Sequence, residues 1–239
     1  MAKTFLQLTN EVGKNLRRST GSTWSALDTS ADQIFIQQAI NEAKRMVEDA
    51  WESDALTVPM TFSSVGSQHA YELSTAGTPN ATDRSAPVRD KSTYKLQLYD
   101  ITDTEFQLSE CSREYAQRLE TLSTVDVTKP SLVAVYPSQN GLVVHFPIAP
   151  AGVRNYKFYV KNPQDDLALA STELTVPWRP VVLAATAIAC EERGEELGLD
   201  ASRWWEQYES ALGSMIAREG YEHDNTLVPE TTDYLNPWS

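Results

Sequence analysis

The chain is poor in the residues that build disulfide frameworks and metal sites, because its 239 residues include only two cysteines and three histidines. Two cysteines are too few for a disulfide framework, and we expect the thiols of Cys111 and Cys190 to be reduced. His69, His145 and His223 lie far apart in the sequence, and none has a cysteine or carboxylate at metal-ligand spacing. The sequence therefore predicts neither a metal centre nor a cofactor.

Motifs for nucleotide binding and acyl transfer are also missing. Gly13, Gly21 and Gly66 are isolated, so there is no glycine-rich phosphate loop, and no G-x-S-x-G elbow occurs. No window approaches the roughly 18 apolar residues of a membrane span, and the opening residues lack the apolar centre of a secretion signal. We therefore expect a protein that is not an enzyme and is made in the cytoplasm.

Basic residues are scarce relative to acidic ones, since 20 Lys and Arg stand against 33 Asp and Glu, with a net charge of -13. This balance opposes binding to phosphate backbones through counterion release, so a sequence-specific DNA-binding protein is disfavoured. Residues 190–239 contain twelve acidic residues and three arginines, whereas residues 1–20 carry a net charge of +3. The two ends could meet across a subunit boundary that includes Arg17 and Arg18. Solvated faces are the alternative interpretation.

The most informative part of the chain is a pair of contrasting helices predicted near 180–196 and 200–218. The first follows Pro180 and is apolar on almost every side, so other elements must cover it. The second carries one apolar stripe at three- and four-residue steps, consisting of Ala201, Trp204, Trp205, Tyr208, Ala211, Leu212, Met215 and Ile216. The stripe predicts packing on the first helix or on a neighbouring copy, with Trp204, Trp205 and Tyr208 in a subunit interface.

Periodicity and composition place the remaining elements. Helical spacing predicts helices near 3–18, 28–52 and 104–121, the second capped by Asp28 or Ser30. Residues rich in Thr, Val and Tyr, several of them alternating in polarity, predict strands at 57–64, 69–74, 94–101, 142–146 and 156–160. Residues 75–92 hold Gly77, Pro79 and Pro87 with almost nothing apolar, and they predict a projecting loop.

Together these elements predict an α+β fold with a helical core and an inserted lobe. The core is assigned to residues 1–55, 104–122 and 177–220, and an antiparallel β-rich lobe to residues 56–103 and 123–176. The polar residues 221–239 form a C-terminal extension with spaced apolar anchors at Tyr221, Leu227, Tyr234, Leu235 and Trp238. This pattern is typical of a segment that orders on a partner.

Four carboxylates gather at the end of the apolar helix, at Glu191, Glu192, Glu195 and Glu196. Their i, i+4 spacing could coordinate a divalent cation. Because Arg193 lies among them, a charged and solvated helix end is the favoured interpretation.

Several segments resemble the head-to-tail adaptor proteins of tailed bacteriophages, including the tail tubular A type. They are KPSLVAVYPSQNGLVVHFPIAP, NYKFYVKNP, LTVPWRPVVLAATAIACEERGEE with the Trp- and Tyr-bearing helix that follows, and the opening KTFLQLTNEVGKNLR. The resemblance covers most of the chain and rests on apolar, proline and aromatic positions, without an active-site signature. PIAP and the loop at 79–87 depart from the family pattern.

The resemblance implies a virion protein copied about twelve times into a ring that carries the DNA channel from portal to tail. It also implies that the β-rich lobe faces the tail or nozzle and that the C-terminal anchors dock on the portal protein. Because an acidic ring repels the DNA backbone, we expect some of the four glutamates to line the channel. The alternatives are another virion assembly protein, such as a nozzle or head-completion subunit, and a small-molecule-binding protein or enzyme.

Overall fold

The α+β class predicted from the sequence is confirmed. The computed structural model describes residues 2–16, 23–27, 30–50, 54–122, 126–197 and 200–224, except for the side chains of 193–197 and 219–224. Within these ranges the chain forms helices and two small, mostly antiparallel sheets. The chain divides into two compact units, one of Met1–Ser53 with Asp165–Ser239 and one of Asp54–Gln164. We call them the helical unit and the β unit.

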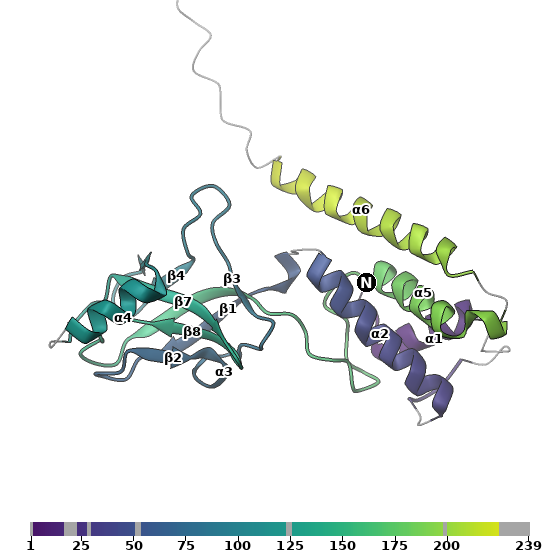
Figure 1. Ribbon diagram of the computed structural model, residues 1–239, viewed down its shortest axis with the longest axis horizontal. Coiled ribbons are helices and arrows are strands. Elements are labelled where there is room, and N and C mark those ends of the chain that lie inside the picture. Colours follow the sequence, from purple (N-terminus) through teal and green to yellow (C-terminus); the bar gives the residue numbers. More distant parts are fainter. Residues whose placement is uncertain are drawn as a thin grey trace, which may run out of the picture. The chain divides into compact units, whose positions relative to one another are not determined.

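The helical unit is built around one buried helix. Its elements are α1 (Phe5–Asn15), α2 (Ala31–Ala50), α5 (Trp178–Leu197) and α6 (Ser202–Asp224). Residues 181–190 of α5 are all buried, and α5 packs against α1, α2 and α6, as Figure 1 shows. The expectation that the apolar helix is covered by other elements is therefore met. No helix in the described ranges is long and apolar enough to cross a membrane.

Local sequence signals set where these helices begin. Thr4 caps α1 through a capping box with Gln7, and the buried Phe5, Leu8 and Val12 follow on one face. Ser30, one of the two predicted caps of α2, accepts the Gln33 N–H at 3.4 Å. The other predicted cap, Asp28, lies outside the described residues.

Two sheets in the β unit share one apolar core. The first sheet has the order β1-β9-β4-β5, with β3 also paired to β9, and the second has the order β2-β8-β7-β6. The strands are β1 (Thr57–Ser63), β2 (Ala70–Glu72), β3 (Ala86–Pro87), β4 (Leu98–Asp100), β5 (Phe106–Gln107), β6 (Ser109–Glu110), β7 (Leu132–Ser138), β8 (Gly141–His145) and β9 (Asn155–Lys161). Met60, Tyr71, Val144 and Phe158 bring side chains from both sheets into one buried cluster.

The strands expected at 57–64, 142–146 and 156–160 are present as β1, β8 and β9. Within 69–74 the strand is only β2, because the short helix α3 (Leu73–Ala76) begins directly after it. Within 94–101 only β4 is a strand. Strand β7 was not expected, and it pairs with β8 in a tight hairpin. Gly141 ends that turn at φ +147°, and a Cβ there would lie 3.1 Å from the Thr82 carbonyl oxygen.

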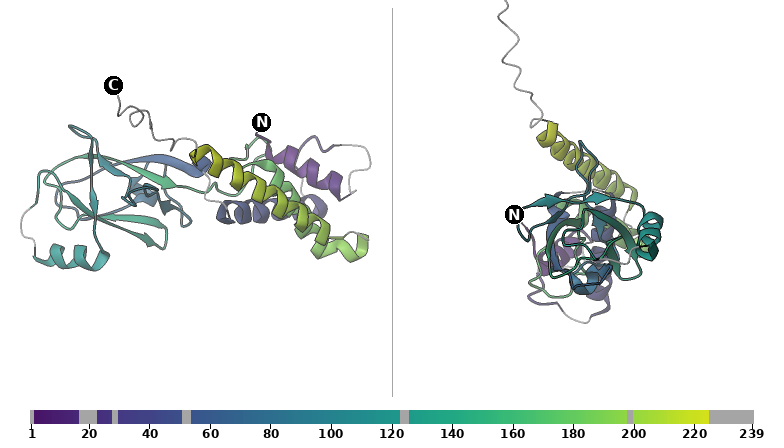
Figure 2. Two further views of the ribbon diagram at one scale, coloured as in Figure 1. Left: turned by 90° about the horizontal axis from the view of Figure 1, so that it is seen from above. Right: turned by 90° about the vertical axis from the view of Figure 1, so that its left-hand side faces the viewer.

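The single helix expected at 104–121 is wrong over its first part. That stretch contains β5 and β6, and α4 (Arg113–Leu122) begins only after them. Helix α4 packs against β7 within the β unit (Figures 1 and 2), whereas residues 104–122 were expected in the helical core. Ala116 is the only buried residue of α4. So narrow an apolar face can cover a sheet but cannot fill the centre of a bundle.

Residues 165–176 also fall in a different unit from the one expected. They belong to the helical unit, where Leu167 and Leu174 are buried. The Leu174 N–H donates to the Lys3 carbonyl at 3.0 Å, and Thr4 and Glu173 form an isolated β-bridge. This segment has few alternating apolar residues, but its backbone pairs with the start of α1.

Only part of the loop expected at 75–92 projects. Thr78 bridges to Thr61 of β1, and β3 pairs with β9, so the first part lies along the sheet. The projecting part is the arm between Arg89 and Leu96, visible between β3 and β4 in Figure 1.

Candidate functional site

Helix α6 carries an apolar stripe that the described part of the chain covers incompletely. Of the stripe predicted from the sequence, Tyr208 alone is buried. The others are half-buried, except for Ile216, which is 43% exposed. We call Trp204, Trp205, Leu212, Met215 and Ile216 the α6 stripe. Partly covered aromatic and methionine side chains in a row are typical of protein interfaces.

Trp205 links α6 to α5, and Tyr208 lies against it on α6. The Trp205 Nε1–H donates to Glu191 Oε1 at 2.6 Å, and the Trp205 and Tyr208 rings meet edge to face with centroids 5.7 Å apart. Burial raises the pKa of the Tyr208 hydroxyl above its ordinary value. Of the three aromatic residues among those predicted for a subunit interface, Tyr208 is buried within its own chain. Trp204 and Trp205 are only half-buried and remain partly exposed to solvent.

A groove of about 530 Å³ lies between the start of α5 and α6. Its lining mixes apolar and charged side chains, among them Trp178, Arg179, Glu206, Met215 and Arg218. Lys3 places its ammonium 3.7 Å from the centre of the Trp178 ring, which fixes one wall by a cation–π contact. The groove adjoins the α6 stripe through Met215.

The other residues predicted for assembly are only partly described. Glu192 is exposed and Glu191 accepts the Trp205 hydrogen bond, but the side chains of Glu195 and Glu196 lie outside the described residues. Tyr221 lies on α6, where only the backbone is described. Outside the described residues altogether are Arg17, Arg18, Leu227, Tyr234, Leu235 and Trp238.

In the β unit, the structure brings together two histidines that lie far apart in the sequence. One ligand atom each from His69, Glu120 and His145 lie within 4.8 Å of one another. The pairing of Ala70 with His145 between β2 and β8 creates this proximity. Sequence spacing could not reveal it, because only a correct strand register would have found the pair.

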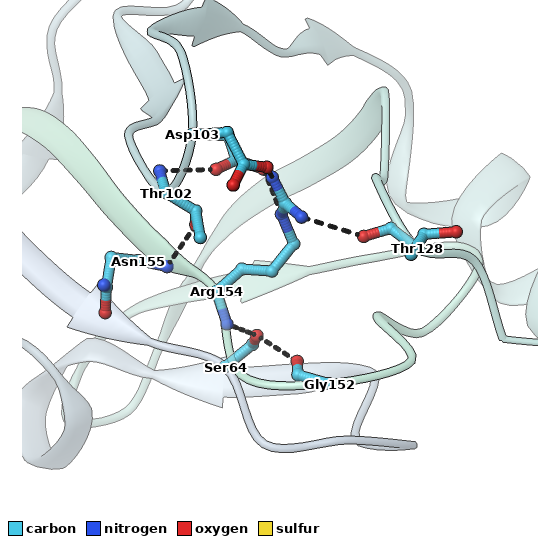
Figure 3. A network of polar contacts seen from close by, with 8 residues as sticks. Ser64, Thr102, Asp103, Thr128, Gly152, Arg154 and Asn155 are labelled. Atoms are coloured by element: carbon cyan, nitrogen blue, oxygen red, sulfur yellow. Dashed lines mark hydrogen bonds and ion pairs between the residues drawn. The ribbon is translucent and has the colours of Figure 1, made fainter.

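A buried polar network surrounds Arg154, whose residue is 9% exposed (Figure 3). Its guanidinium donates to the carboxylate of the fully buried Asp100, to Asp103 Oδ2 at 3.0 Å and to the Thr128 carbonyl oxygen at 3.1 Å. Burial alone would raise the pKa of Asp100, but hydrogen bonds from Arg154 and Thr102 outweigh it, and the net effect lowers the pKa below its ordinary value. The network joins several loops of the unit and is structural.

The projecting arm displays an aromatic side chain on an ordered turn. The Asp90 carboxylate accepts the backbone N–H and hydroxyl groups of Ser92 and Thr93, and these bonds lower its pKa to about 2. The turn therefore keeps its anionic anchor throughout the neutral range. Tyr94 follows at φ 55° with 78% of its surface exposed.

Comparison with known proteins gives no assignment. No protein-family model matches the chain, and no curated protein is significantly similar to it.

Proposed function

We propose that this protein is a structural head-to-tail adaptor of a tailed bacteriophage. About twelve copies form a ring under the portal, extend the DNA channel and provide the attachment site for the tail or nozzle. Its role is assembly within the virion rather than catalysis. The resemblance of the sequence to adaptor proteins motivates the proposal, and the exposed surfaces of both units support it.

The α6 stripe is the observation that carries the proposal. Its half-buried Trp204, Trp205 and Met215 and the exposed Ile216 lie on a long helix that packs on α5, and Tyr208 is the one buried side chain among residues 202–218 of that helix. Covering such apolar side chains with a second surface is favourable, by about 25 cal/mol for each Å² of apolar surface removed from water. A neighbouring copy of the chain is the partner that a ring supplies.

The two units suit different partners. The helical unit carries the C-terminal extension, whose anchors Tyr221, Leu227, Tyr234, Leu235 and Trp238 we assign to portal binding. The β unit carries the arm with the exposed Tyr94, which suits contact with the tail or nozzle.

Single-particle mass measurement of the purified chain with portal rings of the same virus tests this function. The full chain is expected to add to the portal in a fixed multiple near twelve. A chain ending at Asp224 is expected to keep its circular dichroism spectrum but lose portal binding, because it lacks four of the five anchors. A full chain that ignores the portal in every state would refute the adaptor function and favour another virion assembly protein. Undiminished binding by the shortened chain would refute only the anchor assignment.

The four glutamates at the end of α5 are proposed to face the channel or a neighbouring subunit. Replacing Glu191, Glu192, Glu195 and Glu196 together with glutamine is expected to impair ring assembly or DNA ejection, because the DNA backbone then meets a less repulsive wall. Ejection from reconstituted particles and ring mass measure the effect. Changing the exposed Glu42 and Asp49 of α2 to their amides is the control. Normal assembly together with normal ejection in the fourfold variant would show that the assignment is wrong.

A further inference from the structure

His145, the last residue of β8, is a buried imidazole without hydrogen bonds. Its residue is 3% exposed, and neither ring nitrogen has a hydrogen-bond partner among the described residues. Nε2 lies 3.0 Å from Glu120 Oε2, but the contact lacks the direction of a hydrogen bond. Buried polar atoms in native proteins are nearly always satisfied, so an unpartnered one calls for a water or an ion as its partner.

His69 lies beside His145 with its tautomer fixed. The Phe146 N–H donates to the His69 carbonyl at 2.8 Å, and His69 Nδ1 lies 2.9 Å from the Phe146 carbonyl oxygen. Because a carbonyl oxygen only accepts, Nδ1 carries the proton in the neutral ring, and the lone pair is then on Nε2. An imidazole held in this way by a backbone carbonyl is the usual arrangement of a metal-bound histidine.

Glu120 brings a carboxylate to the same point from α4. Its side chain is 42% exposed, so it can adjust, and the three ligand atoms already lie within 4.8 Å of one another. Two ligands bound tetrahedrally to Zn²⁺ at 2.0–2.1 Å lie about 3.3 Å apart. The separation of His145 and Glu120 is close to that value, and a small rotation of His69 or Glu120 brings the third atom into range.

We propose that His69, His145 and Glu120 bind one Zn²⁺ ion. Two imidazoles and one carboxylate form a known three-ligand zinc set with the fourth position left to water, and imidazole favours zinc over magnesium or calcium. The ion joins α4 to the edge of the β2–β8 pair and thereby stabilises the β unit. This site is independent of the adaptor function.

Zinc titration of the full chain after treatment with a chelator tests the site. We expect one zinc per chain by elemental mass spectrometry, with the dissociation constant measured by competition against a chromophoric chelator. Glu120→Gln and His69→Ala are each expected to weaken binding by at least about tenfold, since each removes one of three ligands. These variants avoid His145, because truncating a buried side chain can unfold the unit.

His223→Ala is the matched control, since His223 is the one histidine outside the cluster. It is expected to bind zinc like the unchanged chain. Zinc should raise the unfolding temperature of the unchanged chain and of this control, but not that of Glu120→Gln. The proposal is overturned if the unchanged chain binds no zinc at micromolar concentrations. It is equally overturned if His69→Ala and Glu120→Gln bind as tightly as the control, or if the control loses binding as they do.

Discussion

Replacement of Glu48 with glutamine is expected to lower the free energy of unfolding of the helical unit by about 3–5 kcal/mol. Lys44 and Glu48 lie one turn apart on α2, with Nζ 3.5 Å from Oε1 and both side chains fully buried. The Lys44 ammonium also donates to the Asp165 carbonyl at 3.0 Å. Without the Glu48 carboxylate, the buried ammonium of Lys44 loses the negative charge that lies 3.5 Å from it, and a neutral glutamine amide does not replace that charge.

Tryptophan fluorescence during urea unfolding measures the change in the free energy of unfolding of the helical unit. It reports on this unit because all six tryptophans lie outside Asp54–Gln164. Arg45 and Asp166 provide the control, since this neighbouring ion pair is 54% and 48% exposed. Arg45→Gln is expected to cost less than about 1 kcal/mol. Replacing Lys44 with Met and Glu48 with Leu together should recover most of the loss. A Glu48→Gln effect no larger than that of Arg45→Gln would contradict the prediction.

The sequence was sufficient to predict an element where the burial of its residues follows a local pattern. Helix α2 repeats its apolar residues at helical steps, and residues 181–190 of α5 are apolar on almost every side, so both helices could be predicted with ends close to those observed. Residues 104–121 show the limit, because strands of two residues leave almost no alternation to detect. The packing of α4 on β7 likewise depends on the tertiary structure. The amphipathic pattern of a helix shows which face is buried but not which element covers it.

The candidate zinc site and the Arg154 network could not be predicted, because both depend on strand register. His69 meets His145 through the pairing of β2 with β8, and Arg154 meets Asp100 where β9 pairs with β4. Spacing rules for metal ligands describe residues on one helix or one turn. They carry no information on residues that neighbouring strands bring together.

Replacement of Arg154 with methionine is expected to destabilise the β unit by about 3–5 kcal/mol at pH 7, because Asp100 is left charged and unpaired in the interior. Asp103→Asn is the control, since that carboxylate is 70% exposed and its removal is expected to cost less than about 1 kcal/mol. Hydrogen exchange measured by mass spectrometry on peptides of β4 and β9 follows the β unit separately from the helical unit.

The pH dependence of this loss distinguishes an electrostatic effect from a packing effect. In the unchanged chain the folded pKa of Asp100 lies below its ordinary value. Its contribution to stability is therefore complete above the unfolded pKa and is lost as the pH falls through the folded value. Without Arg154, burial dominates and raises the folded pKa, so the variant loses stability as the pH rises. The difference between the two chains should thus shrink from pH 7 towards pH 4, whereas a difference that stays constant would mean that lost packing, and not the unpaired charge, destabilises the variant.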